Sequence, residues 1–289
     1  KDKTFLLDWM QVYMEAQESA GKKDGSQIKI AMRILKDYAG EMVTLDQIDG
    51  DFCRGYITYL LTEYHPKGKD ISNYTLHNYY RALNGALNSA VRKKKMKANP
   101  FNELEKSEKI RKPESMRSYM TIEEVQALID TPMPHEEYEI VKCAYLFSCF
   151  CGLRISDIIK LKWNDVFVDR GQYRLAVSMK KTKEPIYLPL SPEALKWMPE
   201  RGGKSSEDNV FDLPSANTIR MQLKPWAKAA GISKRFSYHT SRHTFATMML
   251  TLGADLYTVS KLLGHADVKM TQVYAKIINK KKDEAVNLV

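Results

Sequence analysis

Four side chains able to do acid–base or phosphate chemistry gather near the C-terminal end of the sequence. His239 and Arg242 lie three residues apart, His265 follows the run Leu262-Leu263-Gly264, and Tyr274 comes nine positions later. A guanidinium binds phosphate, an imidazole moves protons and a phenol can act as a nucleophile. Together they predict a metal-free site for breaking a phosphodiester bond.

His239 and Arg242 fall at the start of a predicted helix, so both side chains leave one face of its first turn. Cations there oppose the helix dipole, and a bound anion would resolve the conflict. The bland alternative is that Arg242 pairs with a core carboxylate while His239 caps the helix. The spacing alone fits both.

A second guanidinium comes from Arg154, after the bend Gly152-Leu153, and Asp157 follows three residues later. A planar guanidinium held by packed neighbours suits bidentate phosphate binding, and the carboxylate could orient it. A plain ion pair between Arg154 and Asp157 explains the same spacing.

Lys180, Lys181 and Lys183 crowd a turn between two predicted strands. Lysines at such a turn are usually solvated, but an ammonium near a departing oxygen can act as a general acid. His265 also fits a helix C-terminus, and Tyr274, three residues after the expected N-cap Thr271, also fits ordinary packing. The remaining histidines have no neighbour in the sequence that singles them out: His65, His77, His135 and His243.

The sequence contains no spacing typical of a metal or nucleotide site. It has no His-Glu-x-x-His, no magnesium-type acidic cluster and no Walker-type glycine loop. Its four cysteines include no Cys-x-x-Cys pair and fit a reducing cytosol. We therefore expect no metal and no other cofactor.

Length and charge indicate a two-domain protein that binds a polyanion. The 289 residues include 44% hydrophobic and 28% charged residues, which is globular, and exceed one usual domain. A net charge of +10 favours nucleic acid, since surface cations attract phosphates and release counterions. The N-terminal apolar stretch is interrupted by Asp8, Gln11 and Glu15, so we expect no membrane span and a cytoplasmic, nucleoid-associated protein. The chain begins at Lys1 without a methionine, which leaves room for a preceding arm-binding domain.

Hydrophobic periodicity predicts four helices in the first third, within residues 5–13, 28–38, 56–60 and 76–91. They would form a bundle over residues 1–104, whose last helix is stopped by proline at Asn99-Pro100-Phe101. Residues 105–118 have the composition of a linker, and residues 119–289 form the second domain.

The second domain is expected to be α+β. A capping box at Thr121 and Glu124 starts a helical run to Phe150. Short β segments at 166–168, 173–179 and 186–190 predict a small antiparallel sheet. Helices return after Ser191, over 215–230, over 240–252 with Leu252 on the buried face, and from 255 to 264. The predicted fold class is thus mainly α, a four-helix bundle followed by an α+β domain with a small sheet.

The order Gly-Leu-Arg, hairpin Lys, His-x-x-Arg, Leu-Gly-His and Tyr resembles that of the tyrosine recombinases, or phage-type integrases. Residues 121–276 look like the catalytic domain of that family, with its DNA breaking-rejoining fold. The first third is similar to its SAM-like core-binding domain, which binds DNA.

The resemblance implies a role for each matching residue. Arg154 and Arg242 would clamp the scissile phosphate, and His265 would donate to a non-bridging oxygen. Tyr274 would attack to give a 3′-phosphotyrosine that preserves the bond energy without ATP. His239 would assist proton transfer from the nucleophile.

In the same way Lys181 would protonate the leaving 5′ oxygen, with Lys180 and Lys183 as alternatives, and Asp157 would be a supporting acidic residue. In the first domain, we expect DNA contacts from the polar residues in and before one predicted helix: Lys67, Lys69, Asn73, Thr75, His77 and Arg81.

The implied partners are double-stranded DNA recombination sites, bound by a homotetramer that is monomeric when free, with accessory DNA-bending or directionality proteins. Residues 275–289 would dock on a neighbouring copy or pack in cis. The function expected is that of a site-specific recombinase, the integrase of a mobile element. The alternatives are a type IB topoisomerase-like nicking and rejoining enzyme, or a recombinase-derived DNA-binding regulator without catalysis.

Overall fold

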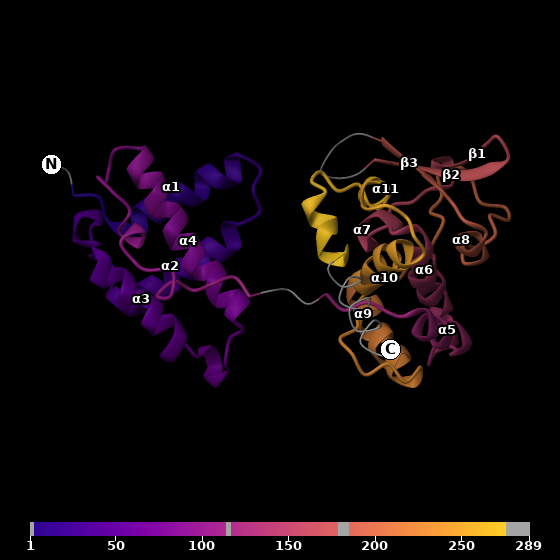
Figure 1. The fold of residues 1–289 in the computed structure, drawn as a ribbon, viewed down its shortest axis with the longest axis horizontal. Helices are drawn as coiled ribbons and strands as arrows, with labels where there is room; N and C mark the ends of the chain where they lie inside the picture. Colours follow the sequence, from indigo (N-terminus) through magenta and orange to yellow (C-terminus); the bar gives the residue numbers. More distant parts are fainter. Residues whose placement is uncertain (1–2, 114–116, 179–184, 276–289) are drawn as a thin grey trace, which may run out of the picture. The chain divides into compact units, whose positions relative to one another are not determined.

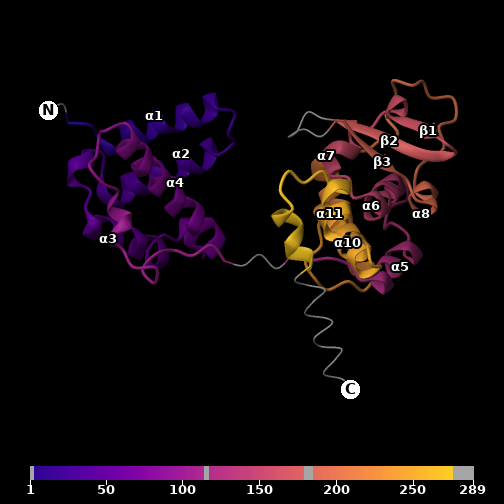
Figure 2. The same cartoon turned by 45° about the horizontal axis from the view of Figure 1, so that its top comes forward.

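The computed structural model describes residues 3–113, 117–178 and 185–275. The chain divides into two compact units, Lys1–Ser115 and Met116–Val289 (Figures 1 and 2). None of the helices in the described part of the chain is long and apolar enough to cross a membrane.

The first unit contains the four helices that the periodicity predicts. They are α1 (Leu6–Ser19), α2 (Gly25–Ala39), α3 (Gly50–Thr62) and α4 (Asn73–Arg92), with 3-10 turns η1 (Leu45–Gln47), η2 (Pro66–Gly68) and η3 (Pro100–Asn102). Side-chain caps start two of them: Asp49 accepts from the Phe52 amide, and Ser72 accepts from the Thr75 amide. Helix α2 packs against α1 and α4 around a core that includes Met10, Leu35 and Leu83.

Helix α4 ends at Arg92, earlier than the expected stop at Pro100. The chain turns away at Lys94, whose φ of 57° is left-handed and cannot continue a helix. Asn99 then ties the chain back onto α4, because its side-chain amide donates to the Asn84 and Asn88 side-chain oxygens at 2.7 and 2.8 Å. The Asn-Pro-Phe segment is therefore a return to the core, where Phe101 is buried.

Part of the segment expected to be a linker lies on the first unit. Ile110 is buried in its core, and Glu108 pairs with Arg54 of α3 at 2.9 Å. Burial of Ile110 fixes the backbone around it more firmly than linker composition suggests.

The second unit mixes helices with one small sheet. Its elements are α5 (Ile122–Asp130), η4 (Glu136–Tyr138), α6 (Glu139–Cys151), α7 (Ile155–Ile158), η5 (Trp163–Asp165), β1 (Val166–Asp169), β2 (Gln172–Ser178), β3 (Pro185–Pro189), α8 (Pro192–Lys196), α9 (Ala216–Ala229), α10 (Tyr238–Thr251) and α11 (Leu256–Leu262). Residues 269–275 are also helical.

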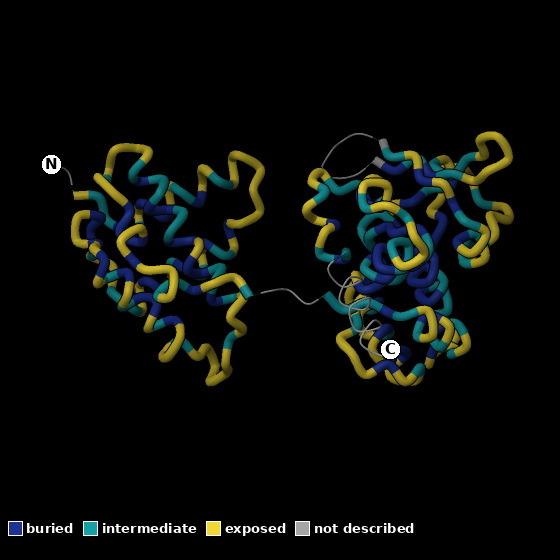
Figure 3. Tube along the Cα trace, in the orientation of Figure 1, coloured by how far each residue is buried: buried dark blue, intermediate teal, exposed yellow. Residues whose placement is uncertain are grey.

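Helix α6 is the centre of this unit. It packs against α8, α9 and α10, and its residues from 144 to 149 are all buried, as Figure 3 shows. The single helical run expected from Thr121 to Phe150 is instead two helices, α5 and α6. Pro132 and Pro134 fall between them and cannot continue the hydrogen-bond ladder of a helix.

The small antiparallel sheet is confirmed, in the order β1-β2-β3. Leu175 of β2 pairs with Val166 on one side and Leu188 on the other, and these side chains share the face toward the core. Strands β2 and β3 flank residues 179–184.

The α10–α11 region follows the predicted caps, with one difference. Asp255 accepts from the Thr258 amide and starts α11 as expected. Leu252, expected on the buried face of its helix, is 70% exposed, because α10 ends at Thr251 and the chain changes direction at Gly253 with a φ of 97°. Figure 2 shows α10 beside α6 and α11, so sequence motifs that are far apart along the chain come together in this domain.

Candidate active site

Arg242 is a cation of the second unit that burial and hydrogen bonds hold in place. It lies one turn into α10, is only 1% exposed, and donates to the backbone carbonyls of Gly152, at 2.7 Å, and Leu263. These carbonyls follow α6 and α11, so the guanidinium joins the ends of two helices to a third. The alternative that Arg242 pairs with a core carboxylate is therefore wrong for these two hydrogen bonds, because their acceptors are backbone carbonyl oxygens.

The bend before Arg154 depends on a glycine. Gly152 caps α6 with a φ of 76°, and a Cβ built on it would lie 2.6 Å from the Phe245 ring and 3.2 Å from Leu263. Glycine is needed here both for the left-handed backbone and for the close approach of α10. The bend leads directly into Arg154, the N-cap position of α7.

Asp157 supports this bend. One of its carboxylate oxygens accepts from the Arg154 amide at 3.4 Å and lies 3.9 Å from the Arg154 guanidinium, while the other accepts from Ser156 at 3.3 Å. The ion pair is thus present, and the same carboxylate also accepts from the backbone amide at the start of α7. Arg154 still exposes 30% of its side chain.

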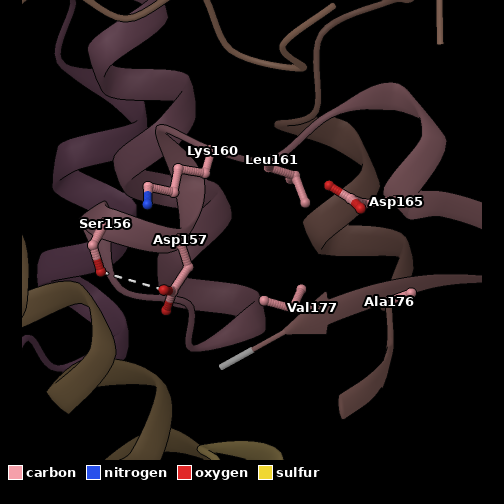
Figure 4. A pocket seen from close by; sticks show the side chains of 7 residues that line it. All are labelled: Ser156, Asp157, Lys160, Leu161, Asp165, Ala176 and Val177. Atoms are coloured by element: carbon pink, nitrogen blue, oxygen red, sulfur yellow. Dashed lines mark hydrogen bonds between the residues drawn. The ribbon is translucent and has the colours of Figure 1, made fainter. Parts of the chain in front are cut away.

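A cavity of about 230 Å³ lies beside Asp157, which is one of its lining residues (Figure 4). Its lining residues come from α7, η5, β2 and the segments between them: Ser156, Asp157, Lys160, Leu161, Asp165, Ala176 and Val177. The cavity is lined by two carboxylates and one ammonium, which makes it a poor site for phosphate. The Arg154 guanidinium, next to Asp157, is a better place for a phosphate to bind.

His265 is held by a residue that was expected to do something else. Its amide donates to the Ser260 carbonyl, and its Nδ1 lies 2.7 Å from the Thr271 hydroxyl. Thr271 was expected to cap the last helix, but that helix begins at Lys269, where Asp267 accepts from the Lys269 amide. Thr271 is instead inside the helix, buried, and orients the imidazole.

Tyr274 is 1% exposed, and its hydroxyl oxygen is bonded by two side chains of the described chain. Arg117 donates to it from Nη1 at 3.0 Å, and Nδ1 of His243 lies 2.6 Å away. His239 is exposed and meets the His243 ring edge to face, with centroids 4.6 Å apart. The five described residues expected to be catalytic, Arg154, His239, Arg242, His265 and Tyr274, therefore lie in one region.

The lowered pKa values of four basic side chains indicate that this region is electropositive. Burial, and then the nearby Arg154 guanidinium, lower the pKa of Arg242 to about 10. Burial and the surrounding guanidinium groups lower the pKa of His265 to about 4 and that of His243 to about 3, and they lower the pKa of His239 as well. A bound anion would offset the part of these shifts that comes from neighbouring positive charge.

The sequence reasoning missed two residues that contact the Tyr274 hydroxyl. His243 lies four residues after His239, so both occupy one helical face, and that spacing was an available signal. Arg117 falls in a stretch without periodicity, and only its contact with a residue 157 positions away reveals it.

The other expected site residues lie either outside the described residues or in the first unit. Lys181, Lys180 and Lys183 lie outside the described residues, as does the tail from 276 to 289. The residues expected to bind DNA belong to the first unit: Lys67, Lys69, Asn73 and Arg81 are exposed, and Thr75 and His77 are half-buried. Arg81 pairs with Asp24 at 3.3 Å, and Thr75 takes part in the Ser72 cap.

The part of the chain that the structure describes contains no group of three or more histidine, cysteine, aspartate or glutamate side chains placed to hold a metal ion. The geometry described above is one of cations, imidazoles and a phenol.

Two family models cover most of the chain. The model of the phage integrase family matches residues 118–281, and that of the phage integrase SAM-like domain matches residues 5–112. The two matches follow the division into two units.

Curated relatives carry the same family name. A tyrosine recombinase of Pseudothermotoga lettingae is 29% identical over 242 residues, which are 76% of this chain and 82% of that protein. Tyrosine recombinase XerD of Vibrio vulnificus is 32% identical over 180 residues, 57% of this chain and 58% of the relative. This chain thus spans somewhat over half the length of XerD.

Solved structures share the fold. The Tn1549 transposon integrase in complex with transposon right end DNA has a TM-score of 0.72 at 17% identity, covering 94% of each chain. A lambda integrase dimer bound to a COC′ core site has a TM-score of 0.67 at 21% identity, covering 94% of this chain and 95% of that one. With a family model matching more than half of its length, the chain belongs to the phage integrase family of tyrosine recombinases.

Proposed function

We propose that this protein is a site-specific DNA recombinase that cleaves and rejoins strands through a 3′-phosphotyrosine intermediate. The observation that carries the proposal is the cluster of cations around a phenol: Arg242 is buried, Arg154 repels it, and Tyr274 lies close enough to influence the pKa of Arg242. Folding holds these charges together, and a phosphodiester is the anion that would neutralise them.

In this reaction Arg154 and Arg242 bind the non-bridging oxygens of the scissile phosphate, and His265 donates a further hydrogen bond. Donors fixed before the reaction stabilise the charge that develops on phosphorus, each by about a hundredfold or more in rate. Arg242 suits this role because its anchor to two carbonyls is already in place. Asp157 holds the bend that carries Arg154.

Tyr274 attacks phosphorus, the bond to the 5′ oxygen breaks, and Lys181 supplies the proton of the leaving group. The phosphotyrosine keeps the energy of the broken bond, so the 5′ hydroxyl of another strand can displace the tyrosine without ATP. His239 takes part in the proton transfers on the nucleophile side.

The relatives suggest the setting. The lambda integrase structures include a dimer on a core site and a tetramer on a Holliday junction, and we propose that this chain likewise works as a tetramer on paired DNA sites. Exposed Lys67, Lys69 and Asn73 of the first unit are proposed to contact the DNA. We further propose integration or excision of a mobile element, carried out at DNA in the cytoplasm with the help of accessory proteins.

The test is a covalent adduct. Genomic fragments that the full chain retains are selected first, and nicked duplexes from them are incubated with wild type and with Tyr274→Phe. Cleavage near the nick releases a short fragment that carries the freed 5′ hydroxyl. Because this fragment diffuses away, the strand cannot be rejoined and the phosphotyrosine is trapped. We expect an adduct only with wild type, although both bind DNA equally. DNA binding without any wild-type adduct would leave a non-catalytic regulator, and relaxation of supercoiled DNA without strand exchange would favour a topoisomerase-like enzyme.

A further inference from the structure

The hydroxyl oxygen of Tyr274 is held between a base and a cation. Nδ1 of His243 lies 2.6 Å from it, and Nη1 of Arg117 donates to it at 3.0 Å. The Arg117 guanidinium also lies 5.4 Å from the centre of the tyrosine ring. A phenol oxygen that accepts from Arg117 keeps its own proton for the imidazole, so Nδ1 of His243 is the acceptor.

The fold fixes both partners. His243 directly follows Arg242 on α10, whose backbone is anchored through the guanidinium of Arg242. Arg117 belongs to a segment that is fastened a few residues later, where the Met120 amide donates to the Thr244 hydroxyl of α10 at 2.9 Å. Contacts set in this way are part of the folded domain rather than chance meetings of long side chains.

His243 is ready to accept a proton. Burial, followed by neighbouring positive charge, lowers its pKa to about 3, so the imidazole is neutral at neutral pH. The groups that face it are the Tyr274 hydroxyl and four basic side chains, Arg117, His239, Arg242 and His265. A phosphate bound by the arginines would offset this positive charge and raise the basicity of His243 at the moment of attack.

We propose that His243 is the base that takes the hydroxyl proton of Tyr274, and that Arg117 stabilises the phenolate oxygen. This inference rests on the proposed function. The bond between Oη of Tyr274 and phosphorus forms while the bond from phosphorus to the 5′ oxygen breaks. The phenol proton moves to Nδ1 of His243, and the 5′ oxygen takes its proton from Lys181. On rejoining, the 5′ hydroxyl attacks phosphorus and gives its proton back to Lys181, the bond from phosphorus to Oη of Tyr274 breaks, and His243 returns its proton to Tyr274.

This role differs from the one that the family resemblance implies for His239. His239 is exposed and contacts the imidazole of His243 rather than the phenol, at 4.6 Å between ring centres. His239 therefore contacts the proposed base and not the hydroxyl from which the base takes the proton.

The experiment measures adduct formation on the nicked duplex under single-turnover conditions, with wild type, His243→Gln and the matched control His135→Gln. His135 is exposed and lies in the same unit. We expect His243→Gln to bind DNA normally and to cleave about a hundredfold or more slowly, the usual size of a lost general base. Its rate should rise as the pH is raised, because hydroxide then replaces the base.

A second substrate distinguishes a base that acts on the nucleophile from an acid that acts on the leaving group. A 5′-bridging sulfur leaves without a proton, so it restores variants that lack the general acid and should not restore His243→Gln. Arg117→Gln is the second variant, expected to lose about tenfold or more because a charge-assisted hydrogen bond to the developing phenolate is gone. Arg117 is half-buried, as His243 is, so DNA binding and urea unfolding are measured for both variants.

Each outcome decides the inference. Absence of a wild-type adduct overturns both the proposed function and this role. A wild-type adduct with equal or faster cleavage by His243→Gln keeps the proposed function and overturns the role of His243. Rescue by the bridging sulfur would place His243 on the leaving group and overturn it too. Unchanged cleavage by Arg117→Gln overturns the part assigned to Arg117.

Discussion

The Arg242 guanidinium donates to the carbonyl oxygen of Gly152 at 2.7 Å, which ties the first helical turn of α10 to the bend that presents Arg154. The residue proposed to bind phosphate is therefore also the residue that positions its partner arginine. Under the proposed function, a single side chain would link the stability of this unit to catalysis.

Replacing Arg242 by lysine should harm both properties. An ammonium cannot reproduce the planar fork that meets the carbonyls of Gly152 and Leu263, so at least one buried carbonyl loses its donor. We expect the free energy of unfolding to fall by about 1–3 kcal/mol and adduct formation to fall by about a hundredfold or more. Urea titration and the nicked-duplex assay measure the two effects. Arg220→Lys, at an exposed arginine bonded to Asn217, is the matched control, and equal behaviour of the two variants would contradict the coupling.

Gly152→Ala should destabilise the chain more than Gly171→Ala. Both glycines have left-handed φ angles, 76° and 78°, so the backbone strain of about 1–2 kcal/mol is shared. A Cβ at Gly152 would lie 2.6 Å from Phe245, whereas a Cβ at Gly171 meets nothing within 4 Å. Crowding adds about 1–3 kcal/mol at Gly152 alone. Urea unfolding of the two variants measures the difference. Equal losses of the free energy of unfolding would show that α10 shifts to accommodate the new methyl group at little cost.

The second unit should lose stability as the pH falls. His265 titrates near its ordinary pKa of about 6.5 when unfolded. Its folded pKa is about 4, because of burial and the Arg242 and Arg154 guanidiniums. The unfolded chain therefore binds more protons between these values, and the free energy of unfolding decreases from about pH 6.5 down to 4.

The measurement is a series of urea titrations of the DNA-free chain across this pH range. His265→Gln should reduce the slope, the rest of which comes from the lowered pKa values of His243 and His239. His135→Gln, at an exposed histidine, should leave the slope as in wild type. A slope that persists unchanged in His265→Gln would assign the pH dependence to other groups.

Much of the fold was predictable because its signals are local. The capping box at Thr121 and Glu124 and the cap at Asp255 mark helix starts, and each makes its expected hydrogen bond. The extent of α4 was misjudged, since no proline or glycine precedes Lys94 to announce the left-handed turn there.

Five of the residues that lie together, Arg154, His239, Arg242, His265 and Tyr274, could be named from the sequence, but their contacts could not. The acceptors of Arg242 lie 90 and 21 residues away in sequence, and Arg117 lies 157 residues from Tyr274. Periodicity reports which face of a helix is apolar, but it carries no information on which carbonyl or hydroxyl that face will meet.

Cleavage should proceed in excess chelator. Two guanidiniums and an imidazole supply the positive charge that a metal ion provides in other phosphoryl-transfer enzymes. Adduct formation by wild type with and without EDTA is the measurement, after dialysis of protein and DNA against the chelator. Loss of cleavage that returns on adding a divalent ion would contradict a mechanism based on the protein's own cations.

The salt dependence of DNA binding tests the lysines of the first unit. If Lys69 contacts a phosphate, Lys69→Gln removes one released counterion, and the slope of log Kd against log salt should shrink by about 0.9. Lys36→Gln is the matched control, because Lys36 is also exposed in the first unit but pairs with Glu41. Fluorescence anisotropy at several salt concentrations gives both slopes. A Lys69 variant with the slope of wild type would remove this residue from the DNA interface, and an equal loss in Lys36→Gln would show that the effect reflects net charge rather than a contact.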